Sequence, residues 1–436
     1  MSGRLLTLGQ PTATEAVQAF LAAGFPHAVL FAGPAGVGKT TLALDVAAAL
    51  LCTADEPADR PCRTCRGCRM VDHGNHPDLH RLGPSGAAAA IPIGGRGERG
   101  VRDLVGDLAL LPAEGGARVA IVEAAQRMSE DAQSALLKTL EEPPRGAVVM
   151  LCADDEERLL PTIRSRCARV RLGPLATRDV EAVLVTHGVA DAPTAARLAR
   201  ISDGRPGHAI AYALAPGAAT IRGEIARTLL DLLRTDLTAR LTGIRDLAGR
   251  AADLGRELDA GSARAAAGLD EAPATGRRVG QGRSGAAPRS GARASGPPSG
   301  GSAATATAGA DPGPGDGSPA ADAAAHGAPA ADTAADSASA ARVPAAERRR
   351  GALVLVRIWR SLLRDLALAG QGANRDVRDL DLIDDLEAIA SSLPASRIGE
   401  LLRDLDEAGE RLEGNVSPEL VLDVLALRWT PGRRAA

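Results

Sequence analysis

The residues from Gly33 to Thr40 read GPAGVGKT, a pattern suited to binding phosphate. Its glycines let backbone N–H groups surround phosphate oxygens, its lysine places a charge on the outer phosphates, and its first threonine offers a hydroxyl to Mg²⁺. The apolar run HAVLFA precedes it and the helical pattern TLALDVAAALL follows it, which is the strand-loop-helix setting that such a loop needs. We therefore expect ATP or ADP to bind here. The predicted cofactor-binding residues of this loop are Gly33, Gly36, Gly38, Lys39, Thr40 and Thr41.

A second group of residues has the spacing of a metal site. Cys52, Cys62, Cys65 and Cys68 supply two overlapping C-x-x-C pairs and one upstream thiol. Four thiolates suit a tetrahedral Zn²⁺ and leave no open position for a catalytic water, so the predicted zinc is structural. A redox C-x-x-C pair is the alternative.

Hydrolysis requires more than the loop. Loops of this type work with an acidic residue for Mg²⁺ after a second apolar strand, and with a group that orients the attacking water. The strand RVAIVEA provides Glu123 for the first role, but Ala124 follows it and cannot polarise water. The sequence therefore predicts a nucleotide site with impaired hydrolysis.

Lysine is rare in this chain. Of 51 basic residues only Lys39 and Lys138 are lysines, which suggests that both positions need a compact ammonium group. Lys138 lies in SALLKTLEEPP, and the later segment LLPTIRSRC contains Arg166. On its chemistry alone, Arg166 is either an ordinary surface arginine or a guanidinium that reaches the phosphate of a neighbouring subunit.

The elements that position these residues change along the chain. Up to residue 172, the apolar runs HAVLFA, RVAIVEA, AVVMLCA and ARVRL alternate with helical patterns, which predicts a parallel sheet with crossover helices. Residues 173–216 carry only short helical patterns. Residues 217–260 and 345–436 are amphipathic and predict a helical bundle shared across residues 261–344. That insert consists largely of Ala, Gly, Pro, Ser and Thr, and is predicted to be disordered.

Composition limits the partners. The net charge of -3 gives no bulk attraction to nucleic acid, so contact with DNA would need a local patch or a partner that carries the charge. There is no apolar run long enough for a membrane span and no signal-peptide pattern at the N-terminus, so we expect a cytoplasmic protein with no membrane contact.

Four stretches in this order, GPAGVGKT, CRTCRGC, ALLKTLEEPP and SRC, resemble the bacterial DNA polymerase III clamp-loader family, an AAA+ assembly. The resemblance implies an AAA+ nucleotide-binding domain over residues 1–172 with a zinc module at 52–68, a helical lid over 173–216, and a collar formed by 217–260 and 345–436. It implies that Arg166 acts in trans on an adjacent subunit's ATP. The implied partners are gamma/tau and delta subunits and, through the assembled loader, the sliding clamp and primer-template DNA.

Within this family the sequence resembles the delta-prime type more than the motor type, gamma or tau. The motor carries an Asp-Glu pair after its second strand and an arginine in its lid, where this chain has Glu123-Ala124 and, at about the second position, Gly207. The resemblance thus implies no intrinsic catalysis, and polymerase activity only by membership of the holoenzyme. A motor ATPase, an independent P-loop enzyme and a scaffold that binds no nucleotide are the alternatives.

Overall fold

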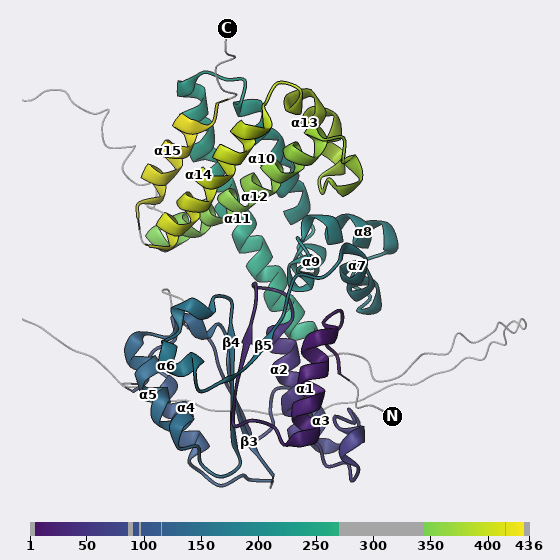
Figure 1. The fold of residues 1–436 in the computed structure, drawn as a ribbon, viewed down its shortest axis with the longest axis vertical. Coiled ribbons are helices and arrows are strands. Elements are labelled where there is room, and N and C mark those ends of the chain that lie inside the picture. The colour runs from purple at the N-terminus through teal and green to yellow at the C-terminus, as the bar shows by residue number, and fades with distance from the viewer. Residues whose placement is uncertain are drawn as a thin grey trace, which may run out of the picture. The chain divides into compact units, whose positions relative to one another are not determined.

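The structure is a computed structural model that describes residues 5–85, 90–95, 97–114, 116–269, 344–414 and 416–430. Its N-terminal part contains a five-stranded parallel sheet with the strand order β2-β3-β4-β1-β5 (Figure 1). The strands are β1 (Ala28–Ala32), β2 (Leu79–Leu82), β3 (Arg118–Val122), β4 (Ala147–Ala153) and β5 (Ala168–Arg171).

Side chains alternate between the two faces of this sheet, and both faces are covered. On β1, Val29 and Phe31 join one buried cluster whereas Leu30 joins the other. Strands buried on both faces read as continuous apolar runs rather than as alternating ones, which is why β1, β3 and β4 were recognisable in the sequence. The helices on the first face are α1 (Pro11–Ala23), α2 (Lys39–Leu50) and α3 (Arg66–Asp72), and those on the second are α4 (Val101–Leu108), α5 (Glu130–Glu141) and α6 (Pro161–Arg164) (Figure 1).

From residue 177 onward all the described regular structure is helical. The α-helices are α7 (Thr177–Thr186), α8 (Ala192–Ile201), α9 (Pro206–Leu214), α10 (Ala218–Leu232), α11 (Leu237–Leu269), α12 (Ala345–Gly370), α13 (Ile383–Ala390), α14 (Ala395–Glu413) and α15 (Pro418–Arg428). Short 3-10 turns complete the described elements: η1 (Pro57–Asp59), η2 (Ala125–Arg127), η3 (Glu156–Arg158), η4 (Asn374–Asp376) and η5 (Leu380–Leu382).

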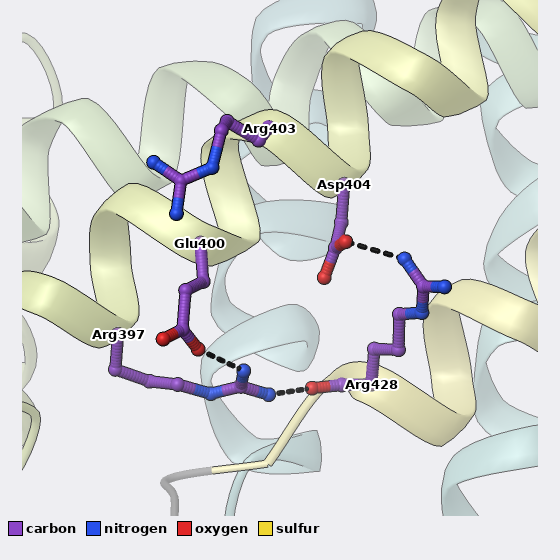
Figure 2. Close-up of a pocket in the computed structure, with 5 residues that line it drawn as sticks. All are labelled: Arg397, Glu400, Arg403, Asp404 and Arg428. Atoms are coloured by element: carbon purple, nitrogen blue, oxygen red, sulfur yellow. Dashed lines mark hydrogen bonds and ion pairs between the residues drawn. The ribbon is translucent and has the colours of Figure 1, made fainter.

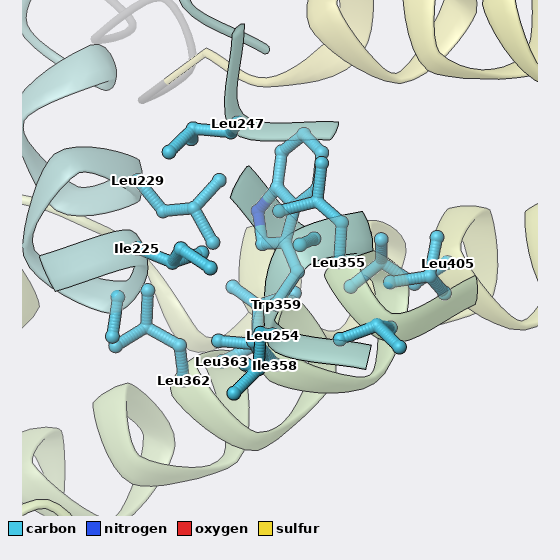
Figure 3. Close-up of a cluster of buried hydrophobic side chains, with 14 of the residues drawn as sticks. Ile225, Leu229, Leu247, Leu254, Leu355, Ile358, Trp359, Leu362, Leu363 and Leu405 are labelled. Carbon is cyan, nitrogen blue, oxygen red and sulfur yellow. The ribbon is translucent and has the colours of Figure 1, made fainter. Parts of the chain in front are cut away.

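Helices from before and after residues 270–343 share one buried core (Figure 3). At its centre the rings of Trp359 and Trp429 meet edge to face with centroids 4.9 Å apart, a favourable geometry for aromatic pairs. The indole N–H of Trp429 donates to the carbonyl of Leu229 at 3.1 Å, so α10 is tied to the C-terminal end of the chain. Neither helical segment covers this core by itself.

Two helix boundaries differ from the sequence-based prediction. Residues 220–259 were expected to be one amphipathic stretch, but they divide into α10 and α11, because the Asp236 carboxylate caps the new helix by accepting from the N–H of Ala239 at 2.9 Å. The predicted disorder from residue 261 is wrong for residues 261–269, which continue α11. Gly261 lies so close to α9 that an added Cβ would be 2.4 Å from the Ala211 carbonyl oxygen, and the guanidinium of Arg264 donates to the carbonyl of Leu214. The rest of the predicted disordered insert, apart from residue 344, lies outside the described residues.

The predicted fold class is confirmed: a P-loop α/β domain with a parallel sheet and a four-cysteine module is followed, in the part of the chain that the structure describes, by helices. Among the described residues, no helix combines the length and apolar character that a membrane crossing requires.

Candidate functional site

The phosphate-binding loop joins β1 to α2 at the carboxyl edge of the sheet. Gly33, Gly36 and Gly38 have φ values of 151°, 80° and 103°, which L side chains rarely adopt. A Cβ on Gly33 would also lie 2.0 Å from the carbonyl oxygen of Leu172, at the end of β5. The loop can therefore keep its shape only with glycine at these positions, and it leads directly into the N-terminus of α2, where backbone N–H groups favour an anion.

Lys39 is the first residue of α2 and is only 6% exposed. Its ammonium group donates to the carbonyl oxygens of Gly33 and Pro34, each at 2.7 Å, and pairs with Asp154 Oδ1 at 2.7 Å. The structure thus places Lys39 at the loop as predicted, with an acidic partner that the sequence had not suggested.

Asp154 comes directly after β4 and is held by Gln126. The Gln126 amide donates to Asp154 Oδ2 at 2.9 Å, and the Asp154 N–H donates to Gln126 Oε1 at 3.1 Å. Gln126 lies in η2, directly after the sharp turn at Ala124, whose φ is 49°. Two neighbouring strand ends therefore fix the carboxylate that faces Lys39.

Glu123, the predicted Mg²⁺ carboxylate, lies at the end of β3 beside β4. Arg81 of β2 donates to Glu123 Oε1 from Nε at 2.9 Å and from Nη2 at 2.7 Å. Between Glu123 and the loop lies Cys152, whose pKa is raised to about 12 by complete burial and then by the Glu123 charge, while a hydrogen bond with the Thr40 side chain opposes the increase. Glu123 and Thr40 are thus both neighbours of Cys152, whereas Thr41 is exposed on α2.

Helix α9 touches the loop. Gly207 donates its N–H to the Gly36 carbonyl at 2.9 Å, and a Cβ on Gly207 would lie 3.1 Å from Gly36 Cα. The next residue, His208, has a pKa lowered to about 4, first by burial and then by the charges of Arg205 and Arg357. The close approach explains in steric terms why glycine occupies position 207.

The four predicted zinc ligands converge. Their sulfur atoms all lie within 4.8 Å of one another, and those of Cys52 and Cys65 are 3.9 Å apart. Zn–S bonds of about 2.3 Å at tetrahedral angles would place sulfur atoms about 3.8 Å apart, so the cluster fits a Zn²⁺ ion. A hydrogen bond from Thr64 lowers the pKa of Cys62 to about 6, while burial raises that of Cys68. Because all four thiols meet, the structure favours a metal site over the redox pair.

The cysteine module is tied to α2, the helix that follows the loop. Arg63 lies between two of the clustered cysteines and pairs with both Asp45 on α2 and Asp72 on α3. Asp45 is fully buried and also accepts from the N–H of Thr7 at 2.9 Å and from its hydroxyl at 2.7 Å. One carboxylate therefore joins the N-terminal segment, α2 and the cysteine module.

Arg166 lies on the opposite side of the sheet, directly after α6. Its guanidinium pairs with Glu141 of α5 at 2.7 Å and donates to the Thr162 carbonyl at 3.0 Å. The side chain is 36% exposed and Glu141 is 49% exposed, so the group is accessible from solvent. Lys138, on the same α5 helix, is also exposed.

Two family models match this sequence. Residues 9–176 match the family described as "DNA polymerase III, delta subunit", and residues 336–431 match "DNA polymerase III, delta subunit, C terminal". The DNA polymerase III subunit delta' of Pseudomonas aeruginosa is 38% identical over 182 residues, which are 41% of this chain and 53% of that protein. Over these residues the chain is similar to the delta' subunits of DNA polymerase III.

Other similarities are more distant. The DNA polymerase III subunit tau of Salmonella typhimurium is 32% identical over 218 residues, which are 48% of this chain and 33% of that protein. The match therefore spans about half of the delta' relative and a third of tau. A Thermotoga maritima RuvB Holliday junction branch migration motor aligns over 53% of this chain and 80% of that one, with 16% identity and a TM-score of 0.34. That score is too low to support an argument about function.

A separate recess lies between α14 and α15 (Figure 2). Its charged side chains largely satisfy one another. Arg397 pairs with Glu400 at 2.7 Å, and Arg428 pairs with Asp404 at 2.5 Å. We therefore assign no ligand to this recess.

Sequence reasoning missed Asp154, Gln126 and Arg81. The available signal was position, because Asp154 follows β4, the neighbour of β1, Gln126 follows β3, the next strand along, and the carboxyl ends of parallel strands meet at one edge. Arg81 could not be found in this way because its short strand β2, LHRL, carries two polar residues and was not recognised.

Proposed function

We propose that this chain is a delta'-type clamp-loader subunit that binds nucleotide at its P-loop without hydrolysing it. The observation that carries the proposal is the state of Glu123. Its carboxylate accepts two hydrogen bonds from Arg81, and the following residue is Ala124, so this strand end offers no free acidic group to orient water.

The proposed role in hydrolysis belongs to Arg166, in trans. An arginine that stabilises the charge developing on a transferred phosphoryl group must be exposed and must tolerate loss of its resting partner. Arg166 meets both conditions, because its pair with Glu141 is largely solvent-exposed and contributes only about 0–1 kcal/mol.

The remaining assignments rest on the similarity to delta' subunits and are proposals. Residues 1–172 form the nucleotide-binding domain, 173–216 the lid, and 217–260 with 345–436 the collar that assembles with gamma/tau and delta subunits. The assembled loader opens the sliding clamp and closes it around primed DNA. The four cysteines hold one structural Zn²⁺ per chain, which metal analysis of purified protein tests. A Cys65→Ser variant that keeps both zinc and stability would contradict it.

The isolated chain distinguishes this function from a motor. The similarity to tau and the intact loop favour the motor alternative. We expect labelled ADP or ATP to bind at micromolar concentration while steady-state ATPase stays at background. Steady turnover that disappears in Lys39→Ala would replace our proposal with the motor, and absence of nucleotide binding would reduce the chain to a scaffold.

The assembled loader tests Arg166. We expect Arg166→Ala to reduce hydrolysis at the adjacent site by about 10³-fold or more, so that total ATPase falls by that site's share. Assembly, measured by size-exclusion chromatography, should not change. Glu141→Gln is the matched control, since it removes the same ion pair but keeps the guanidinium. Equal ATPase in wild type and Arg166→Ala would exclude the role.

A further inference from the structure

The nucleotide site contains a carboxylate beside its phosphate-binding lysine. An ammonium group has three N–H donors, and the three oxygen atoms around Lys39 Nζ, from Gly33, Pro34 and Asp154, lie at 2.7 Å each. Only the Asp154 oxygen carries a full charge. In a P-loop the lysine serves the outer phosphates of the nucleotide, so Asp154 lies where a terminal phosphate oxygen would need to approach Lys39.

Asp154 is not free to turn away. Its other oxygen accepts from the Gln126 amide, and its own N–H donates back to the same side chain. Rotation away from Lys39 would break the ion pair and the amide hydrogen bond together. The carboxylate is therefore a built part of the site, although its side chain is 37% exposed.

A carboxylate at this place discriminates between nucleotides by charge. ATP carries one more negative charge than ADP, and its terminal phosphate would bring charged oxygens close to Asp154, where like charges within a few ångströms repel each other. ADP lacks that group and needs only the loop N–H groups and Lys39. Glu123 is a second acidic residue at the site, but its charge is already neutralised by Arg81. It therefore does not offset the repulsion between Asp154 and a terminal phosphate.

We propose that Asp154 makes this a nucleoside diphosphate site, in which the carboxylate takes the place beside Lys39 that a terminal phosphate would occupy. The inference rests on the proposed function, because it requires that the loop binds nucleotide. It goes further by naming the form that is bound and the residue that selects it.

The test is calorimetric titration of the full-length chain with ADP, ATP and a non-hydrolysable ATP analogue, each with and without Mg²⁺. We expect ADP to bind at least about tenfold more tightly than either triphosphate. Asp154→Asn keeps the size and the possibility of bonding Gln126 but removes the charge, and it should abolish the preference mainly by strengthening triphosphate binding. Asp155→Asn is the matched control, because Asp155 is the adjacent residue and pairs with Arg158 rather than with Lys39.

The outcomes are distinct. Equal or tighter triphosphate binding by the wild type would overturn the inference while leaving nucleotide binding intact. A preference that persists in Asp154→Asn would assign the selectivity elsewhere and likewise overturn it. Failure of every nucleotide to bind would remove the proposed nucleotide-binding function itself, and the inference with it.

Discussion

Replacing Asp45 with asparagine should destabilise the nucleotide-binding domain much more than the same change at Asp72. Both carboxylates pair with Arg63, but Asp45 is fully buried whereas the side chain of Asp72 is 33% exposed. Asp45 also accepts from backbone N–H groups of Leu6 and Thr7. An amide at this position loses the charge and can turn an N–H donor toward these donors.

The expected cost follows from burial. Removing one partner of a buried ion pair costs about 3–5 kcal/mol, and we expect about 3 kcal/mol for Asp45→Asn because Arg63 keeps Asp72. Asp72→Asn should cost less, on the order of 1 kcal/mol, because this carboxylate is partly exposed to solvent. Burial also raises the pKa of Asp45 above 3.8 despite Arg63. A raised carboxyl pKa means that the folded state binds the proton more tightly, so this group's contribution to stability falls as pH rises from about 3.8 through the folded pKa.

The loss of stability in the nucleotide-binding domain is measured by denaturant unfolding, with zinc release to a chromogenic chelator as the signal. Far-UV circular dichroism gives the helical signal, but tryptophan fluorescence would not serve, because both tryptophans lie in the C-terminal helical core. Asp45→Asn should also lose the part of the pH dependence that Asp45 causes. Unfolding free energies of the two variants within about 1 kcal/mol of each other would refute the assignment of Asp45 as the central link.

Three further predictions concern other parts of the molecule. In denaturant titrations, Trp429→Phe should destabilise the helical core by about 1–3 kcal/mol more than Trp359→Phe. The reason is that the Trp429 N–H donates a buried hydrogen bond, whereas the buried Trp359 N–H has no partner among the described residues. Equal costs for the two substitutions would contradict this. Arg81→Ala should make nucleotide binding more dependent on Mg²⁺ in calorimetry by freeing Glu123, and an unchanged Mg²⁺ dependence would argue against the competition. The lowered pKa of His208, about 4, means that its contribution to stability is complete above about pH 6.5 and is lost as pH falls through the window down to about 4, by at most on the order of 3 kcal/mol; melting temperatures of wild type and His208→Asn should converge in that window.

Much of the nucleotide-binding domain was predictable because each of its strongest signals is local. The spacing of glycine and lysine identifies the loop in the sequence, and the spacing of cysteine identifies the predicted zinc module. The three longer strands, β1, β3 and β4, are almost wholly apolar because both of their faces are buried. Such patterns can be recognised in the sequence without any knowledge of tertiary contacts.

The partners of these residues could not be predicted in the same way. Asp154 lies in the run CADDEER, where three further acidic residues offer the same chemistry, and only the register of β4 beside β1 selects it. The extension of α11 depends likewise on contact with α9, which allows Gly261 and Arg264 to stay helical in a segment of low apolar content. Composition alone pointed to disorder there.

The charges at the strand ends give one account of the site. Lys39 with Asp154 and Arg81 with Glu123 form two ion pairs, so these four groups sum to zero before any nucleotide or Mg²⁺ is bound. In a P-loop that hydrolyses ATP, the lysine binds phosphate and the strand carboxylate binds Mg²⁺. Here each has a protein partner, and an incoming triphosphate with its metal ion would have to displace both. A diphosphate lacks the terminal phosphate and can leave both ion pairs in place, so an intact loop and impaired hydrolysis are consistent features of one site.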